Sequence, residues 1–342
     1  MTAILTHTQA EKALIGALDG ATGWRAHLRE ATQRDGLPTR RNEFWKWSDL
    51  RRAANDVSGV GRLDVTGLDG LTNVKDGDRI ELAVAASAGA SAADAALVVP
   101  AGASVTLVET LKGAAGSLGN WHMTIRLEAG ARLDRVVITD HDADAVFVGS
   151  AEIELAETAT LNQTMVDTGA RLSRNETHVT HPGQGASITM GGAYVLAAGR
   201  HADTTNLVHH TGPGGVTQQL VKGAVASGGH GVFQGKFIVD RAAQQTDARM
   251  THRALMLGER AEIDAKPELE IYADDVQCAH GNALGTLDET ALFYMRQRGL
   301  PKARARALLI ESYLAEPLDR VQDEALRERL KASLRARLGA LI

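Results

Sequence analysis

The chain has 342 residues, of which 44% are hydrophobic, 23% are charged and 4% are aromatic, and its formal net charge is −5. With this hydrophobic content, disorder is not the default expectation. The acidic balance argues against nucleic acid as the main partner, because a phosphate-binding surface usually shows as a basic excess. Cys278 is the one cysteine in the sequence, so no disulfide can form within the chain.

The sequence also bears on location and on the style of the fold. Its first residues lack a basic segment followed by an apolar run, and no apolar stretch reaches the roughly 18 residues of a spanning helix. We therefore expect a soluble protein of a reducing compartment, the cytoplasm. The 35 glycines and the few aromatics favour many short strands joined by tight turns, because glycine accepts a positive φ.

Residues 1–75 are expected to form an N-terminal helical region. Apolar residues recur at helical spacing over 8–34, although two glycines interrupt the pattern. A short helix is expected to begin near Pro38. Three aromatic residues follow it and are expected to form a small local core: Phe44, Trp45 and Trp47.

Residues 76–283 are expected to form a β core built from a repeat. The pattern small–Ala–x–aliphatic begins at four positions and returns more weakly at a fifth: Gly102, Gly130, Thr158, Gly185 and Gly214. Successive copies are 28, 28, 27 and 29 residues apart, which is typical of a solenoid whose repeats must stack to bury their faces. Chance recurrence in a chain rich in glycine and alanine is the alternative, and an out-of-phase copy at 169–172 favours it.

Residues 284–342 are expected to form a C-terminal helical region. Thr286 and Glu289 have the spacing of a capping box, and the helical run that follows stops at Gly299. A last amphipathic stretch over 322–338 has leucines at i, i+4 spacing, namely Leu326, Leu330, Leu334 and Leu338.

Several enzyme motifs are missing from the sequence. It contains no P-loop and no Gly-x-Ser-x-Gly elbow, and the glycine-rich segment 211–215 lacks the dinucleotide spacing and is expected to be a turn. On strands, His178 and His181 would point to opposite faces, as would the adjacent His209 and His210. Neither pair could simply share an ion, so we expect scattered surface histidines here.

The segment 274–281 stands apart because it combines the one thiol with an imidazole. If it is extended, Cys278 and His280 project from the same face, about 6.6 Å apart along the strand. Thiolate and imidazole are ligands of iron and of iron–sulfur clusters, but two ligands do not complete a site. Any metal or cluster held here would need ligands from another chain. The alternative is a buried, inert thiol beside an exposed histidine.

Five segments of the sequence resemble the signatures of the SufB/SufD family of the bacterial SUF iron–sulfur cluster assembly system. The C-terminal signature is carried by residues 278–281, 287–301 and 305–310, and the N-terminal one by 36–41 and 45–50. The single cysteine and the chain length are similar to the SufD branch, because the SufB branch is longer and has several cysteines.

This resemblance implies a right-handed parallel β-helix core, or solenoid, between helical N- and C-terminal regions. It implies a non-catalytic scaffold that pairs with SufB and binds SufC, the ATPase of the system, through the C-terminal helices. A transient cluster would form at the SufB–SufD interface, reduced flavin is possible through the complex, and the chain alone could form a homodimer.

The resemblance also assigns site residues. The cysteine and histidine of the family signature correspond to Cys278 and His280, the candidate cluster ligands. Arg296, Arg298 and Arg304 are the candidate contacts to SufC, because arginine suits interface carboxylates. Phe293, Tyr294 and Leu309 are expected to pack locally instead.

A β-helix enzyme or binding protein acting on polysaccharide is the alternative function. It would need carboxylates on one face of the solenoid beside a groove. Asp140, Asp142 and Asp144 would share a face if extended, but such a row is more often a solvated turn. The scarcity of aromatic residues that could stack on sugars also argues against it.

Overall fold

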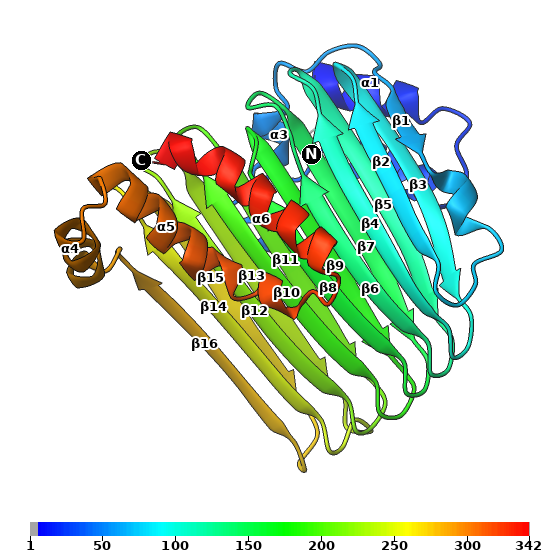
Figure 1. The fold of residues 1–342 in the computed structure, drawn as a ribbon. Coiled ribbons are helices and arrows are strands. Elements are labelled where there is room, and N and C mark those ends of the chain that lie inside the picture. Colours follow the sequence, from blue (N-terminus) through cyan, green and yellow to red (C-terminus); the bar gives the residue numbers. More distant parts are fainter. Residues whose placement is uncertain (1–5, 342) are drawn as a thin grey trace.

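The structure is a computed structural model that describes residues 6–341. Two sheets of nine and seven strands face each other, and the chain passes from one to the other at every coil, so that it forms a β-solenoid (Figure 1). Within each sheet neighbouring strands are parallel, except that β1 pairs with β2 in the antiparallel sense. The predicted solenoid is therefore confirmed.

The strands have nearly constant length. The nine-stranded sheet contains β1 (Leu63–Thr66), β2 (Arg79–Ala86), β4 (Ser104–Gly113), β6 (Arg132–Thr139), β8 (Thr160–Asp167), β10 (Ser187–Leu196), β12 (Val216–Val225), β14 (Asp247–Met256) and β16 (Gln277–Gly285). The seven-stranded sheet contains β3 (Gly89–Val99), β5 (Ser117–Leu127), β7 (Val146–Leu155), β9 (Leu172–His181), β11 (His201–His210), β13 (His230–Val239) and β15 (Glu262–Ile271).

The sequence repeat marks one turn of each coil. The aliphatic residues of successive copies are cross-strand partners, since Val105 pairs with Leu133, Leu133 with Leu161 and Leu161 with Ile188. The small residue that opens each copy has a positive φ, which glycine adopts without strain and which Thr158 also adopts, with a φ of 56°. The out-of-phase copy at 169–172 has its own place in the solenoid, because it leads into β9 in the other sheet.

Side chains that point between the two sheets form the main core. Most are aliphatic and fully buried, as the columns through Val105 and Leu107 show. A charged pair is also enclosed there: Arg135 donates to Glu109 at 2.6 Å, and Trp121 donates its indole N–H to the same carboxylate at 2.8 Å. Because each partner satisfies the other, the pair can remain buried between the sheets.

The N-terminal region forms short helices rather than one long one. They are α1 (Gln9–Ala17), α2 (Gly23–Asp35), the 3₁₀ turn η1 (Glu43–Trp45), α3 (Leu50–Ala53) and the 3₁₀ turn η2 (Leu68–Leu71). The helix expected over 8–34 is broken because Gly20 and Gly23 have positive φ. Thr8 and Glu11 form a capping box at the start of α1, which the sequence reading missed.

Residues 43–48, here called the strap, lie across the outer face of the seven-stranded sheet. The predicted local aromatic core is wrong, because Phe44 is 48% exposed and Trp45 lies over the guanidinium group of Arg174 in β9, 4.1 Å from the ring centre.

Further contacts of the strap reach the next three strands of the same sheet. Ser48 bonds to His201 and Asp203 of β11, and Gln234 of β13 donates to the carbonyl of Phe44 at 3.1 Å. Lys266 of β15 donates to Glu43 at 2.9 Å. The strap therefore ties four successive coils together.

The C-terminal region contains α4 (Glu289–Gln297), α5 (Lys302–Ala315), the 3₁₀ turn η3 (Leu318–Arg320), α6 (Glu324–Leu338) and the 3₁₀ turn η4 (Gly339–Leu341). The four leucines predicted for the last amphipathic helix are buried against the outer face of the nine-stranded sheet. Asp288 caps α4, so the capping box expected between Thr286 and Glu289 is wrong; the side chain of Asp288 reaches the amides of Thr290 and Ala291 directly.

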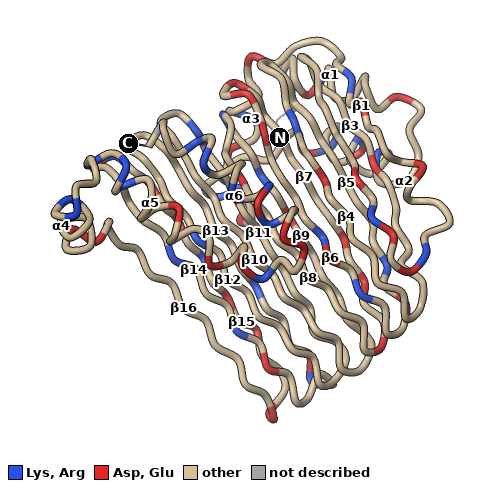
Figure 2. Tube along the Cα trace, in the orientation of Figure 1, with Lys and Arg blue, Asp and Glu red and all other residues tan. Residues whose placement is uncertain are grey.

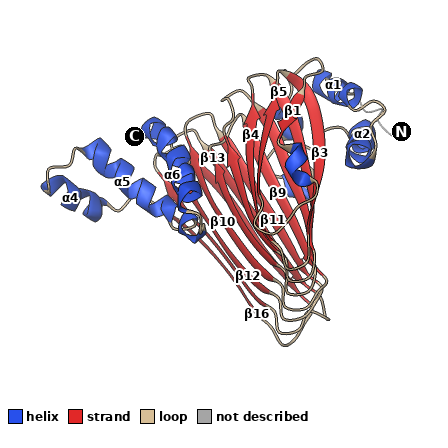
Figure 3. Cartoon of the chain, turned by 45° about the vertical axis from the view of Figure 1, so that its right-hand side comes forward, coloured by secondary structure: helices blue, strands red, loops and turns tan. Residues whose placement is uncertain are grey.

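The positions of the terminal helices differ at the two ends of the chain. In Figure 3, α1 and α2 lie beside the first coils, whereas α4 extends outward and α5 runs from it back to the outer face of the nine-stranded sheet, where it contacts β12 and β10. Ion pairs fix α6 to the sheet, for example Arg337 to Asp140 at 2.7 Å. Within residues 6–341, no helix is both long enough and apolar enough to cross a membrane.

Candidate functional site

The two ends of the solenoid are built differently. At the first coil, β1 covers the edge of β2 and α1 lies against β3. At the last coil, no further strand pairs with β15 or β16 among the described residues. The last coil therefore presents two strand edges, and we call this the open end.

Of the two edges, that of β16 is better suited to pair with a strand of another chain. Gln277 donates its backbone N–H to β14, so the N–H groups of Cys278, His280 and Asn282, which alternate with it, point to the open end. Figure 2 shows that β16 carries no Lys, Arg, Asp or Glu along its length. Unpaired, uncharged strand edges are templates for another strand.

The edge of β15 differs in its donors and charges. Glu262 donates its backbone N–H to the preceding coil, so the backbone N–H groups of the residues that alternate with it point to the open end. Pro267 is one of these residues, and proline has no N–H to offer. The outward side chains of β15 include several acids that are paired with neighbouring coils, such as Glu270 with Lys236 at 2.6 Å. Charge and proline both blunt a strand edge.

Cys278 and His280 both lie on β16 with side chains on the inner side of the sheet. Their neighbours in β14 are Ala248 and Met250, which are buried in the main core. Cys278 is half-buried against that core, whereas His280 is exposed because no coil covers it. The structure thus brings the two predicted residues to one face at the open end.

Burial raises the pKa of the Cys278 thiol, and it outweighs the opposite effect of the Ala248 amide. The thiol of the free chain is therefore protonated at neutral pH. A metal ion that binds there must displace the proton, which metals do readily. Among the described residues, no group of three His, Cys, Asp or Glu side chains could hold a metal ion, so Cys278 and His280 need ligands from outside this part of the chain.

Asn282 is a third inward-facing residue on β16 that the sequence reading missed. Its carboxamide Oδ1 lies 2.8 Å from Nδ1 of His252 in β14, and Nε2 of His252 lies 2.9 Å from the hydroxyl of Tyr194 in β10. The alternation of Cys278, His280 and Asn282 along one strand was the signal that could have revealed it.

Known proteins identify the family to which these residues belong. Residues 82–313 match the family model described as SUF system FeS cluster assembly, SufBD core domain. The chain belongs to the SufBD family. It is thus related to components of SUF iron–sulfur cluster assembly, as the resemblance in the sequence implied.

Individual relatives agree with the SufBD assignment. The chain is 31% identical over 215 residues to the iron–sulfur cluster assembly protein SufD of Escherichia coli, which covers 63% of this chain and 51% of that protein. It is 37% identical over 172 residues to a SufBD family protein of Synechocystis, covering 50% and 38%. SufD of Bacillus subtilis is 29% identical over 169 residues, covering 48% and 38%. The chain thus spans about half or less of the length of these relatives.

The three arginines proposed as contacts to SufC are exposed on the hairpin of α4 and α5. Arg296 lies in α4, Arg298 follows its last turn and Arg304 lies in α5. The expected local packing of Phe293 and Tyr294 is wrong, because they are 57% and 65% exposed. Leu309, which we expected to pack, does lie against the C-terminal apolar cluster.

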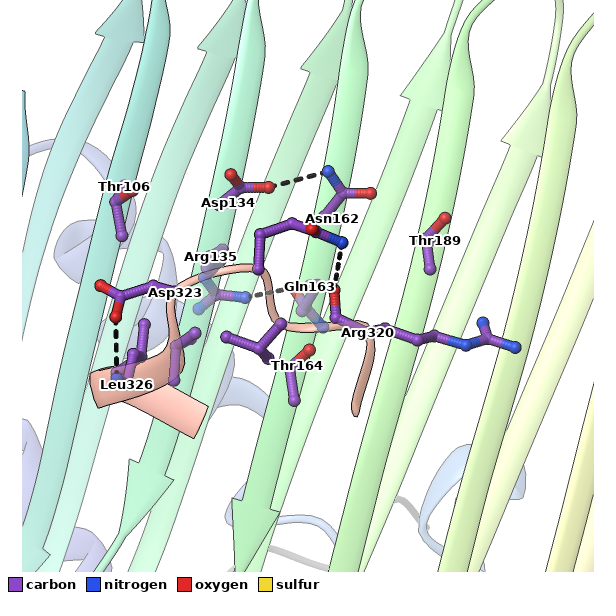
Figure 4. A pocket seen from close by; sticks show the side chains of 13 residues that line it. Thr106, Asp134, Arg135, Asn162, Gln163, Thr164, Thr189, Arg320, Asp323 and Leu326 are labelled. Atoms are coloured by element: carbon purple, nitrogen blue, oxygen red, sulfur yellow. Dashed lines mark hydrogen bonds between the residues drawn. The ribbon is translucent and has the colours of Figure 1, made fainter. Parts of the chain in front are cut away.

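Two cavities among the described residues of this SufBD chain lie apart from Cys278 and His280. Figure 4 shows one of about 50 Å³ below the segment that joins η3 to α6, where Thr106, Asp134, Asn162 and Thr189 come from four neighbouring strands. Asn162 donates to Asp134 at 2.8 Å. This cavity lies at the interface between the C-terminal helices and the sheet. An open groove of about 440 Å³, lined partly by Leu287 and Arg306, lies at the root of α4.

The other sequence candidates have structural explanations. Asp140, Asp142 and Asp144 lie in the turn between β6 and β7, where Asp142 accepts from the amide of Asp144. The expectation of surface histidines is wrong for His181 and His210. Both are fully buried and bonded to each other, because the faces that carry them point into the core, and burial lowers the pKa of His210 to about 3.

Proposed function

We propose that this chain is a non-catalytic scaffold subunit for SUF iron–sulfur cluster assembly. In this proposal its open end pairs with a SufB subunit, its hairpin of α4 and α5 binds the SufC ATPase, and a nascent cluster forms at the SufB interface. The cluster is cargo, and ATP hydrolysis takes place in SufC. Reduced flavin could reach the cargo through the complex.

The observation that carries the proposal is the contrast between the two ends of the solenoid. One end is covered by its own β1 and helices, and at the other the outer edge of β16 has no partner strand among the described residues. The same strand carries Cys278 and His280 on its inner side. A partner solenoid seated on this end would cover the exposed core and could supply the missing ligands. A second copy of the chain could occupy the same edge when SufB is missing.

The site chemistry fits a shared cluster better than a resident metal. A neutral imidazole and an ionised thiol are both accepted by iron. His280 is exposed and can reach a cluster directly, whereas Cys278 must lose a proton that burial helps it to keep. We therefore assign the larger role to His280 and a role that depends on the partner to Cys278.

The docking of SufC is supported by the shape and surface of the C-terminal helices. The hairpin of α4 and α5 projects from the solenoid at α4, whereas α5 packs on β12 and β10 (Figure 3). It combines exposed aromatic rings with exposed arginines, which are the residue types enriched at the centres of interfaces.

The test is co-expression of the tagged chain with SufB and SufC, followed by purification without oxygen. We expect all three proteins to co-purify with iron, sulfide and visible absorption. His280→Ala should lower the iron and sulfide content at least several-fold while the three proteins still co-purify, and Cys278→Ser should have a weaker effect. His178→Ala, an exposed histidine on the outer face of β9, is the matched control.

Two results would count against the proposal at different points. If SufB and SufC do not co-purify with the wild-type chain, the scaffold assignment is wrong. If the His280→Ala complex carries the wild-type content of iron and sulfide, His280 is not a ligand.

A further inference from the structure

We infer that Asn282 belongs to the end site as a hydrogen-bond donor to the sulfide of the cluster, and that His252 and Tyr194 hold it in position. This inference rests on the proposed function, because it deepens the same site. It starts from the inner face of β16, where Asn282 is the next side chain after His280. Asn282 is exposed at the open end, whereas its partner His252 is fully buried.

The Asn282 amide presents its Oδ1, rather than its NH₂ group, to Nδ1 of His252. Its Oδ1 can only accept, so Nδ1 of His252 must carry the proton at this 2.8 Å contact. In a neutral imidazole the other nitrogen then accepts, so Tyr194 donates to Nε2 at 2.9 Å. With Oδ1 bound to His252, the NH₂ group on the other branch of the planar amide is left for a partner outside the solenoid.

The interior is built to accommodate this arrangement. Tyr194 is fully buried, and its ring occupies space that only glycine leaves open: a Cβ on Gly223 would lie 2.1 Å from the ring, and one on Gly231 would lie 2.7 Å from it. The ring of Phe233 stacks on His252 with a centroid distance of 4.7 Å and an interplanar angle of 4°. The imidazole is thus fixed on both its edge and its face.

The chemistry of the cargo explains what the amide can do. Cluster sulfides carry negative charge and accept N–H hydrogen bonds, which influence the stability and reduction potential of the cluster. Partners that orient or bond to ligands change metal affinity by about 10- to 100-fold. An amide NH₂ group that faces the open end beside His280 could donate a hydrogen bond to a sulfide of any cluster held there.

The first test uses complexes assembled with SufB and SufC. Asn282→Ala removes both the acceptor and the donor, while Asn282→Asp keeps an acceptor for His252 and removes the donor. We expect both variants to release iron to a chelator about tenfold faster than wild type, with a lower midpoint potential. Tyr194→Phe should shift both measurements in the same direction but less. Ala279→Asp adds the same charge on the outward face of β16 and should leave both measurements unchanged.

The outcomes separate this inference from the proposed function. If Asn282→Ala releases iron at the wild-type rate, the inference is wrong. It is also wrong if Asn282→Ala releases iron rapidly while Asn282→Asp releases it at the wild-type rate, because Asn282 would then only hold the strand in place. If the wild-type complex carries no iron and sulfide, the proposed function itself fails.

A second measurement needs no cluster. In the chain alone, nitrogen NMR of labelled histidine should show His252 protonated at Nδ1, in wild type and in Asn282→Asp. Protonation at Nε2 would overturn the assigned direction of the Asn282 amide.

Discussion

Four histidines, three of them fully buried and one partly buried, give the folded chain a specific response to acid. Burial lowers the pKa of His141, His201 and His210 to about 3 and that of His252 to about 4. In the unfolded chain these groups bind protons below about pH 6.5, so between pH 6.5 and 3 the unfolded state binds more protons than the folded one. Stability is therefore fully present above pH 6.5 and is lost as the pH falls.

The expected result is a free energy of unfolding that falls steeply between pH 6.5 and 4. Each histidine contributes up to about 1.4 kcal/mol per pH unit. Burial raises the pKa of Asp167, which acts in the opposite direction but is a single group. His141→Asn should keep an acceptor for the amide of Gly113. It should lower the slope of the free energy of unfolding against pH by up to about 1.4 kcal/mol per pH unit, whereas His178→Gln should leave this slope unchanged. Urea unfolding at several pH values measures this, and equal slopes in all three proteins would contradict it.

The residue scale also shows where the sequence was insufficient. Strand alternation separates His178 from His181 correctly, but it does not say which of the two faces is inside. That is decided by the nine-stranded sheet, which closes over His181; His210, from the neighbouring strand of the same sheet as His181, bonds to it there. Cys278 and His280 could be found because their chemistry is rare in this sequence, whereas His252, 30 residues before Asn282, could be connected with it only through the register of β14 and β16.

At the scale of elements, the hairpin of α4 and α5 is the part of the chain whose surface most resembles an interface. Changing Arg296, Arg298 and Arg304 together to alanine should weaken SufC binding at least about tenfold, because interface arginines are often hot spots. The same is expected when Phe293 and Tyr294 are changed to serine. Circular dichroism should stay unchanged, because all five side chains are exposed.

Titration of SufC against each variant measures this prediction. Arg62→Ala, at the covered end of the solenoid, is the matched control, and its side chain is 80% exposed. Unchanged affinity in both sets of variants would show that SufC binds elsewhere on the chain.

Elements were predictable where local chemistry dictates them. The repeat could be read because each coil needs a small residue in the left-handed region before an aliphatic one, as at Gly130 and Leu133. The start of α4 was misjudged because Asp288 and Thr286 are both good caps and only the backbone path decides between them. The strap was misread because its aromatic residues pack against strands far away in sequence.

At the scale of the whole molecule, the stacked coils should unfold together. Leu133 is fully buried between coils, so Leu133→Asp places an unpaired charge in a core shared by its neighbours. We expect a loss of about 3 kcal/mol or more in a single transition. Val98→Asp is the control, because Val98 is 51% exposed. Denaturant unfolding followed by both circular dichroism and tryptophan fluorescence measures this, and a near-native midpoint for Leu133→Asp would mean that this position does not face the core.

The strap has a consequence for the order of events during translation. Glu43 leaves the ribosome early, yet its partner Lys266 is 223 residues further along the chain. The contact of Trp45 with Arg174 can form once β9 has been made, but the strap can close fully only after the coil that contains β15 has been made. Domains generally fold as their residues emerge, but here the contacts of the strap are completed only after Lys266 has emerged. Complete closure of the strap thus requires the coils from β9 to β15 to be in place.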